Sequence, residues 1–184
     1  PLEVAISLAL YIAERNTGAF HNTFITFSES PTLQIIAGNT LKEKVNNLSR
    51  ADWDMSTDVS KVFDLILNSA LSNKLPQSEL PETLFIVSDM QFDSADSSGN
   101  SAYSRAKKTF EANGYTLPKL VFWNVRAVPG NVPVTINDSG VYLVSGNSPT
   151  IFQKAVNTAV TSPEDLMKEV LLSERYLPVI SAVN

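Results

Sequence analysis

Two oxygen-bearing side chains, those of Thr57 and Asp89, have the chemistry to bind a hard divalent cation. Asp89 comes directly after Ser88 and the short apolar run of residues 84–87, which is typical of a strand buried on both faces of a parallel sheet. Thr57 comes just before a predicted helix. Because ligands of open α/β sheets bind at the carboxyl ends of the strands, Asp89 is expected where a metal site would form.

Each of these residues also has a simpler interpretation. Asp89 can end a strand and begin a turn, and Thr57 with Asp58 can cap the helix that follows. The two interpretations differ in whether the side chains of Thr57 and Asp89 lie close enough to bind the same ion. That depends on how the helix after Thr57 and the strand before Asp89 are arranged in the fold.

Strands alternate with helices along the chain. The apolar spacing predicts helices over residues 1–16, 40–48, 60–75, 101–113, 148–160 and 163–172, and strands over 20–28, 32–37, 84–88, 119–125 and 141–144. This order predicts parallel βαβ units in an α/β fold with three layers, a Rossmann-like sheet with helices on both faces, formed by residues 1–184 as a single domain. Right-handed crossovers then bring the loops at 51–58 and 88–93 to the same edge.

Composition narrows the possible functions. The 184 residues carry a net charge of -5, contain no cysteine, and contain one histidine, His21. Thiolate metal sites and disulfides are therefore excluded. Without a basic block, direct nucleic-acid binding is not expected. No apolar run reaches about 18 residues, so neither a transmembrane helix nor a membrane partner is predicted. The lack of cysteine and of a signal peptide leads us to expect a cytoplasmic location.

Several motifs occur in the order found in a known family. They are WDMSTD (53–58), VFDLIL (62–67), FIVSDMQFD (85–93), VFWNVR (121–126), GVYLVSG (140–146) and LLSERY (171–176). The chain resembles a von Willebrand factor A domain with a metal-ion-dependent adhesion site. More narrowly, it resembles the carboxyl-terminal half of the domain of unknown function 2828 family.

This resemblance implies a metal site, but the sequence lacks part of the family's ligand motif. It implies that Thr57 and Asp89 are metal ligands, that the metal is Mg²⁺ or Mn²⁺, and that an acidic residue of a protein partner completes the coordination. The family's remaining ligands, in an Asp-x-Ser-x-Ser motif on the first strand, are not present in this sequence. We therefore expect a von Willebrand factor A-like sheet lacking its first strand, so that the strands at Phe24 and Phe85 have no shared neighbour. We also expect the native protein to continue upstream, and residues 1–184 to bind metal weakly or not at all.

Three classes of function remain to be compared. The first is a protein-interaction module that depends on a metal in the full-length form. The second is the carboxyl-terminal domain of an RNA-associated protein that resembles the Ro proteins, with its RNA contacts upstream. The third is a metal-dependent phosphoryl-transfer enzyme, which the sequence disfavours because it has no glycine-rich phosphate loop and no nucleophile beside a base. We expect a binding module rather than an enzyme.

Overall fold

The computed structural model describes residues 2–26, 28, 30–51, 58–88, 102–125, 140–145, 167–168 and 171–176. The chain divides into two compact units, Pro1–Asn147 and Ser148–Asn184. Only the short 3₁₀ helix η3 (Glu174–Tyr176) and a few neighbouring residues are described in the second unit. The helices predicted over 148–160 and most of 163–172 lie outside the described residues. A single domain over residues 1–184 stays a prediction.

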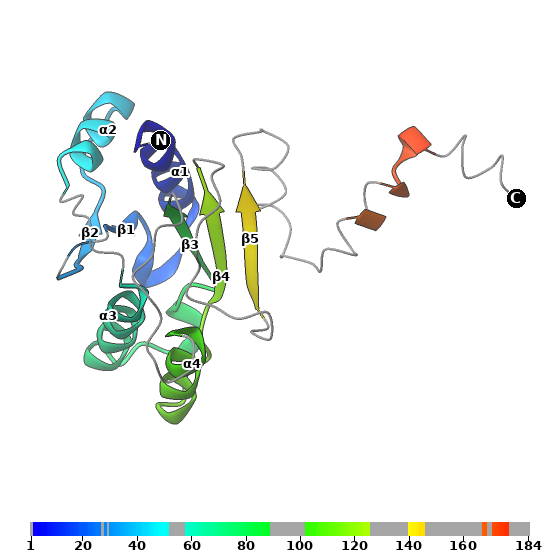
Figure 1. The fold of residues 1–184 in the computed structure, drawn as a ribbon. Coiled ribbons are helices and arrows are strands. Elements are labelled where there is room, and N and C mark those ends of the chain that lie inside the picture. The colour runs from blue at the N-terminus through cyan, green and yellow to red at the C-terminus, as the bar shows by residue number, and fades with distance from the viewer. Residues whose placement is uncertain are drawn as a thin grey trace, which may run out of the picture. The chain divides into compact units, whose positions relative to one another are not determined.

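The first unit is a mixed α/β structure with two separate sheets (Figure 1). Strands β3 (Thr83–Ser88), β4 (Lys119–Asn124) and β5 (Val141–Ser145) form a parallel sheet in that order, consistent with a Rossmann-like fold. Strands β1 (Thr23–Ile25) and β2 (Leu33–Ile35) form an antiparallel pair. The expectation of parallel units throughout was therefore wrong for β1 and β2, because their short connection favours a hairpin.

In the described residues of the first unit, four helices accompany these strands: α1 (Leu2–Arg15), α2 (Leu41–Ser49), α3 (Val59–Ser72) and α4 (Ala102–Ala112). Two 3₁₀ helices, η1 (Gly18–Phe20) and η2 (Gln77–Glu79), lie in the connections. Thr40 caps α2 in a reciprocal capping box with Glu43, as the sequence predicts. None of the helices in the described ranges is long and apolar enough to cross a membrane.

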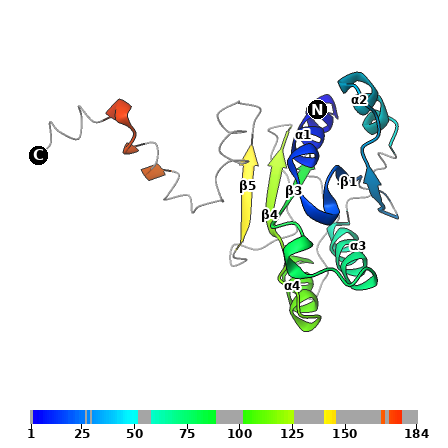
Figure 2. The same cartoon turned by 180° about the vertical axis from the view of Figure 1, so that it is seen from behind.

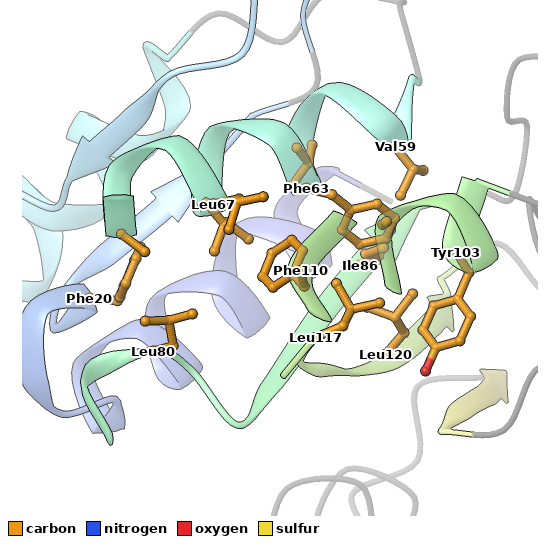
Figure 3. Close-up of a cluster of buried hydrophobic side chains, with 14 of the residues drawn as sticks. Phe20, Val59, Phe63, Leu67, Leu80, Ile86, Tyr103, Phe110, Leu117 and Leu120 are labelled. Atoms are coloured by element: carbon orange, nitrogen blue, oxygen red, sulfur yellow. The ribbon is translucent and has the colours of Figure 1, made fainter. Parts of the chain in front are cut away.

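The larger core lies between the parallel sheet and helices α3 and α4 (Figure 3). Leu120 and Phe122 of β4 and Ile86 of β3 point into it. Val121 and Trp123 alternate with them along β4 and are equally buried, so they lie on the opposite face of the sheet. Trp123 is therefore a core residue. A strand buried on both faces explains why residues 120–123 are continuously apolar.

A second core lies on the other side of β1, against α1 and α2 (Figure 2). It includes Phe24, whereas the adjacent Ile25 packs against the larger core. Because successive side chains of a strand point to opposite faces, α1 and α2 cover one face of β1 and the larger core covers the other. Helix α1 also contacts β3, so it touches a strand of each sheet. An ion pair between Lys44 and Glu14 links α2 to α1.

Candidate functional site

Three polar residues share one row at the carboxyl edge of the parallel sheet. Ser88 of β3 is in register with Asn124 of β4, and Asn124 is in register with Ser145 of β5. Each is the last residue of its strand. This is the edge at which ligands of α/β sheets bind.

The amino end of α3 lies at this same edge. Its opposite end is fixed near the start of β4, because the Tyr115 hydroxyl donates to the Leu75 carbonyl at 2.7 Å and the Thr116 N–H donates to Gln77 Oε1 at 2.7 Å. The 14 residues of α3 span about 21 Å, which is close to the roughly 20 Å of the six-residue strand β3. The helix therefore runs back along the sheet, and its first turn lies near the end of β3, in agreement with the presence of Val59 and Ile86 in one core.

Asp58 caps this first turn. Its Oδ1 accepts a hydrogen bond of 2.9 Å from the Ser60 N–H. The unpaired N–H groups at the start of a helix carry partial positive charge, and they favour a nearby carboxylate. The simpler interpretation of residue 58 as a cap is thus confirmed. Figure 3 shows Val59, the next residue, on the side of the core where Ile86 and Tyr103 lie, away from Leu80.

Thr57 and Asp89, the two predicted metal ligands, both lie outside the described residues. In sequence, Thr57 immediately precedes the cap Asp58, and Asp89 immediately follows Ser88 at the end of β3. The structure thus describes the residue next to each predicted ligand, but neither Thr57 nor Asp89 itself. Within the described parts of the chain, no group of three or more His, Asp or Glu side chains is placed to hold a metal ion.

The carboxyl groups whose pKa values depart from the ordinary value lie on helices α1 and α2 rather than at the carboxyl edge of the parallel sheet. A hydrogen bond from the Lys44 ammonium lowers the pKa of Glu14 below its ordinary value. Backbone N–H groups of Asn39 and Thr40 donate to Glu43 and lower its pKa in the same way. These shifts come from helix pairing and helix capping, so they mark structural contacts.

The polar ends of β4 and β5 are not among the predicted site residues. The strand predicted over residues 141–144 ends one residue before Ser145, which is the last residue of β5. The signal that could have found them is the polar residue that ends each apolar run, at positions 88, 124 and 145. His21, which lacks a carboxylate partner in the sequence pattern, places Nδ1 2.7 Å from the Asn16 carbonyl oxygen, in agreement with a structural role.

Comparison with known proteins identifies a domain family and a viral relative. The sequence pattern of a family described as "Domain of unknown function (DUF7788)" matches residues 1–175. "Uncharacterized protein L728" of Acanthamoeba polyphaga mimivirus is 38% identical over 173 residues, which cover 93% of this chain and 30% of the mimivirus protein. The chain therefore spans less than a third of that relative. No solved structure matches the chain.

Proposed function

The chain belongs to the DUF7788 family of domains of unknown function, and from this premise we propose that it is a protein-interaction module whose longer form binds Mg²⁺ or Mn²⁺. The proposal includes the finer assignment to a von Willebrand factor A-like fold. What supports it is the placement of the first turn of α3 near the edge at which β3 ends, which follows from the fixed far end of the helix and the similar lengths of helix and strand. The candidate ligands Asp89 and Thr57 are the sequence neighbours of those two ends.

The chemistry at this edge suits a hard cation. A carboxylate after β3 and a hydroxyl before α3 would supply two oxygen ligands from separate loops, with waters in further positions. The polar row of Ser88, Asn124 and Ser145 ends the three strands at this same edge. The strand interiors between Thr83 and Ser88 of β3 and between Lys119 and Asn124 of β4 are apolar, so the polar residues of these two strands lie at their ends.

The break between the two sheets supports the finer assignment. β1 and β3 are not hydrogen-bonded to each other, so the strands that contain Phe24 and Phe85 lie in different sheets, as the resemblance led us to expect. In the resembling family, a strand between them carries an Asp-x-Ser-x-Ser motif with the remaining ligands. We propose that this strand belongs to the native protein upstream of residue 1, and that the metal site is complete only in its presence.

A site with an incomplete ligand shell suggests binding rather than turnover. When the protein and water leave one metal position exchangeable, a carboxylate from another protein can fill it. Binding of the partner then requires the metal, so a chelator would reverse it, and it requires an acidic residue on the partner. Selectivity for one partner would come from the loops around the edge, which include residues 52–56 and 90–100 in sequence.

Calorimetric titration with Mg²⁺ and Mn²⁺ tests this proposal. It should be carried out on residues 1–184 and on a version extended upstream to include the preceding segment of the native protein. We expect saturable binding by the extended protein and weak or no binding by residues 1–184, since Thr57 and Asp89 alone are too few ligands. Equal and tight binding by both would show that the upstream segment supplies no ligand. Binding by neither would contradict a metal-dependent module.

A further inference from the structure

We propose that β5 is a docking surface for a second copy of this chain. The two copies of β5 would pair antiparallel across a two-fold axis, with Leu143 of one copy opposite Leu143 of the other. The parallel sheets of the two copies would then form one continuous sheet. The pairing uses the backbone and side chains of β5, so it goes beyond the proposed metal site and does not depend on it.

The outer edge of β5 can be assigned residue by residue. The Leu120 N–H of β4 donates to the Gly140 carbonyl at 2.9 Å. Backbone groups of successive strand residues point to alternate sides, so the even-numbered residues of β5 face β4. The N–H and C=O groups of Val141, Leu143 and Ser145 therefore face away from β4, toward an edge with which no described strand pairs. Figure 1 shows β5 on the outside of this sheet, with β4 between it and β3.

Leu143 presents an apolar side chain beside this edge. Its register partner Phe122 is fully buried in the larger core, whereas Leu143, on the same face of the sheet, is 65% exposed. Val141, two residues earlier, packs against that core. The larger core therefore covers the start of β5 and leaves its middle open. Removing this apolar surface from water favours association with another strand.

β5 lacks the features that usually protect the edge of a sheet. Natural edge strands are blunted by charged side chains, by proline or by being very short. The five residues of β5 contain no charged residue and no proline. The strand β2 also has an edge with which no described strand pairs, but it is only three residues long and closely follows Pro31. Of these two edges, β5 is therefore the one suited to pair with another strand.

The composition of β5 favours a second copy as the occupant. A two-fold axis brings identical residues together, so a charged residue on such a strand would face its own charge. The chain carries a net charge of -5, yet β5 itself is uncharged. Antiparallel pairing about Leu143 also opposes Val141 to Ser145 of the other copy, so every outward N–H and C=O group of β5 gains a partner. The strand is thus complementary to itself.

The dimer would present its two carboxyl edges in opposite directions. Strands β3, β4 and β5 are parallel to one another, and antiparallel pairing of β5 reverses the direction of the whole sheet in the second copy. The two candidate metal sites would therefore lie at opposite edges of the joined sheet, and two partners would bind one dimer without competing.

Sedimentation equilibrium of residues 1–184, without added metal, tests the proposal. The average mass should rise with protein concentration from that of one chain toward that of two. Leu143→Lys should weaken dimerisation at least about tenfold, because two ammonium groups would then face each other. Ile35→Lys is the matched control, since Ile35 is 72% exposed on β2, and it should leave dimerisation unchanged. Neither substitution alters a buried side chain, and circular dichroism at concentrations too low for dimerisation should show that both variants fold.

Mixing two charge variants tests the two-fold register itself. Leu143→Lys and Leu143→Glu should each dimerise weakly alone, because each places like charges opposite one another. An equimolar mixture should recover dimerisation, because opposite charges then meet across the pair of strands.

Three results would overturn the proposal. The first is that the chain stays monomeric up to about 1 mM. The second is that Leu143→Lys dimerises as well as the unmodified chain, or that only Ile35→Lys loses dimerisation, which would assign the interface to β2. The third is that the mixture of charge variants does not recover dimerisation. Because no metal is added, these outcomes are separate from those of the metal titration.

Discussion

Replacing Phe122 with alanine is expected to lower the free energy of unfolding by about 3–5 kcal/mol. Phe122 is 0% exposed and lies in the middle of the central strand of the parallel sheet, where it contacts the larger core under α3 and α4. Removing the ring takes away its buried apolar surface and leaves a cavity that the surrounding close-packed side chains fill only partly. The loss should be seen as a lower urea midpoint in circular dichroism with an unchanged slope.

Leu143 provides a matched control for this substitution. It is the register partner of Phe122 on β5, yet it is 65% exposed. Leu143→Ala should therefore change the free energy of unfolding by less than about 0.5 kcal/mol. Equal losses from the two substitutions would mean that burial on β4 does not control the stability of this sheet, and the assigned core would be wrong.

Replacing Asp89 with alanine in the full-length protein is expected to weaken Mg²⁺ binding by at least about 100-fold, equivalent to about 3 kcal/mol. In the proposed site, Asp89 is the charged ligand that this chain supplies, and Thr57 contributes only a neutral hydroxyl. Loss of the carboxylate removes both a coordination bond and the negative charge that offsets the cost of dehydrating the ion. Calorimetric titration of the two proteins measures the difference directly.

Asp64 serves as the control carboxylate, because it is exposed in the middle of α3, away from the first turn of that helix. Asp64→Ala removes the same charge from the chain and should leave Mg²⁺ affinity unchanged within about twofold, since exposed charges at a distance are screened. If Asp89→Ala and Asp64→Ala have equal effects, the contribution of Asp89 is only to net charge. If neither weakens binding, Asp89 is not a ligand.

The elements with strong apolar periodicity were predictable from the sequence. The helix predicted over 60–75 is α3, and its apolar face, which includes Val62, Phe63 and Ile66, is buried as its spacing indicates. The strands predicted over 84–88 and 119–125 are β3 and β4, because continuous apolar runs leave few alternatives. In these elements, local propensity and tertiary burial favour the same structure.

The first strand region was predicted less well. A single strand was expected over residues 20–28, but η1 ends at Phe20 and β1 covers only Thr23–Ile25. Between them, Asn22 has a positive φ of 53°, which interrupts extended backbone. Alternating residues alone do not reveal such a turn. The antiparallel pairing of β1 and β2 could have been predicted from the sequence, because a connection as short as theirs favours a hairpin over a parallel crossover.

From the sequence, only the location of the candidate site at the carboxyl edge of the parallel sheet was predictable. The order of strands and helices predicts that the end of β3 and the start of α3 lie at one edge, because chain crossovers follow from topology, and the bounds of β3 and α3 agree with such an arrangement. The contribution of Asn124 and Ser145 needed the register of three strands, which no local pattern supplies. Whether Thr57 and Asp89 converge on one ion stays a prediction, since loop conformation depends on ligands and neighbours that the sequence pattern does not encode.

Paramagnetic broadening by Mn²⁺ in the full-length protein is the most direct test of the proposed metal site. Bound Mn²⁺ broadens the NMR signals of nearby amides steeply with proximity, so a substoichiometric addition maps the site. We predict that Ser88, Asn124 and Val59 broaden first, while Thr83 and Lys119 at the opposite edge stay sharp, and that Asp89→Ala removes this pattern. Broadening that is uniform, that centres on the opposite edge, or that persists in Asp89→Ala would contradict a metal site at the carboxyl end of β3.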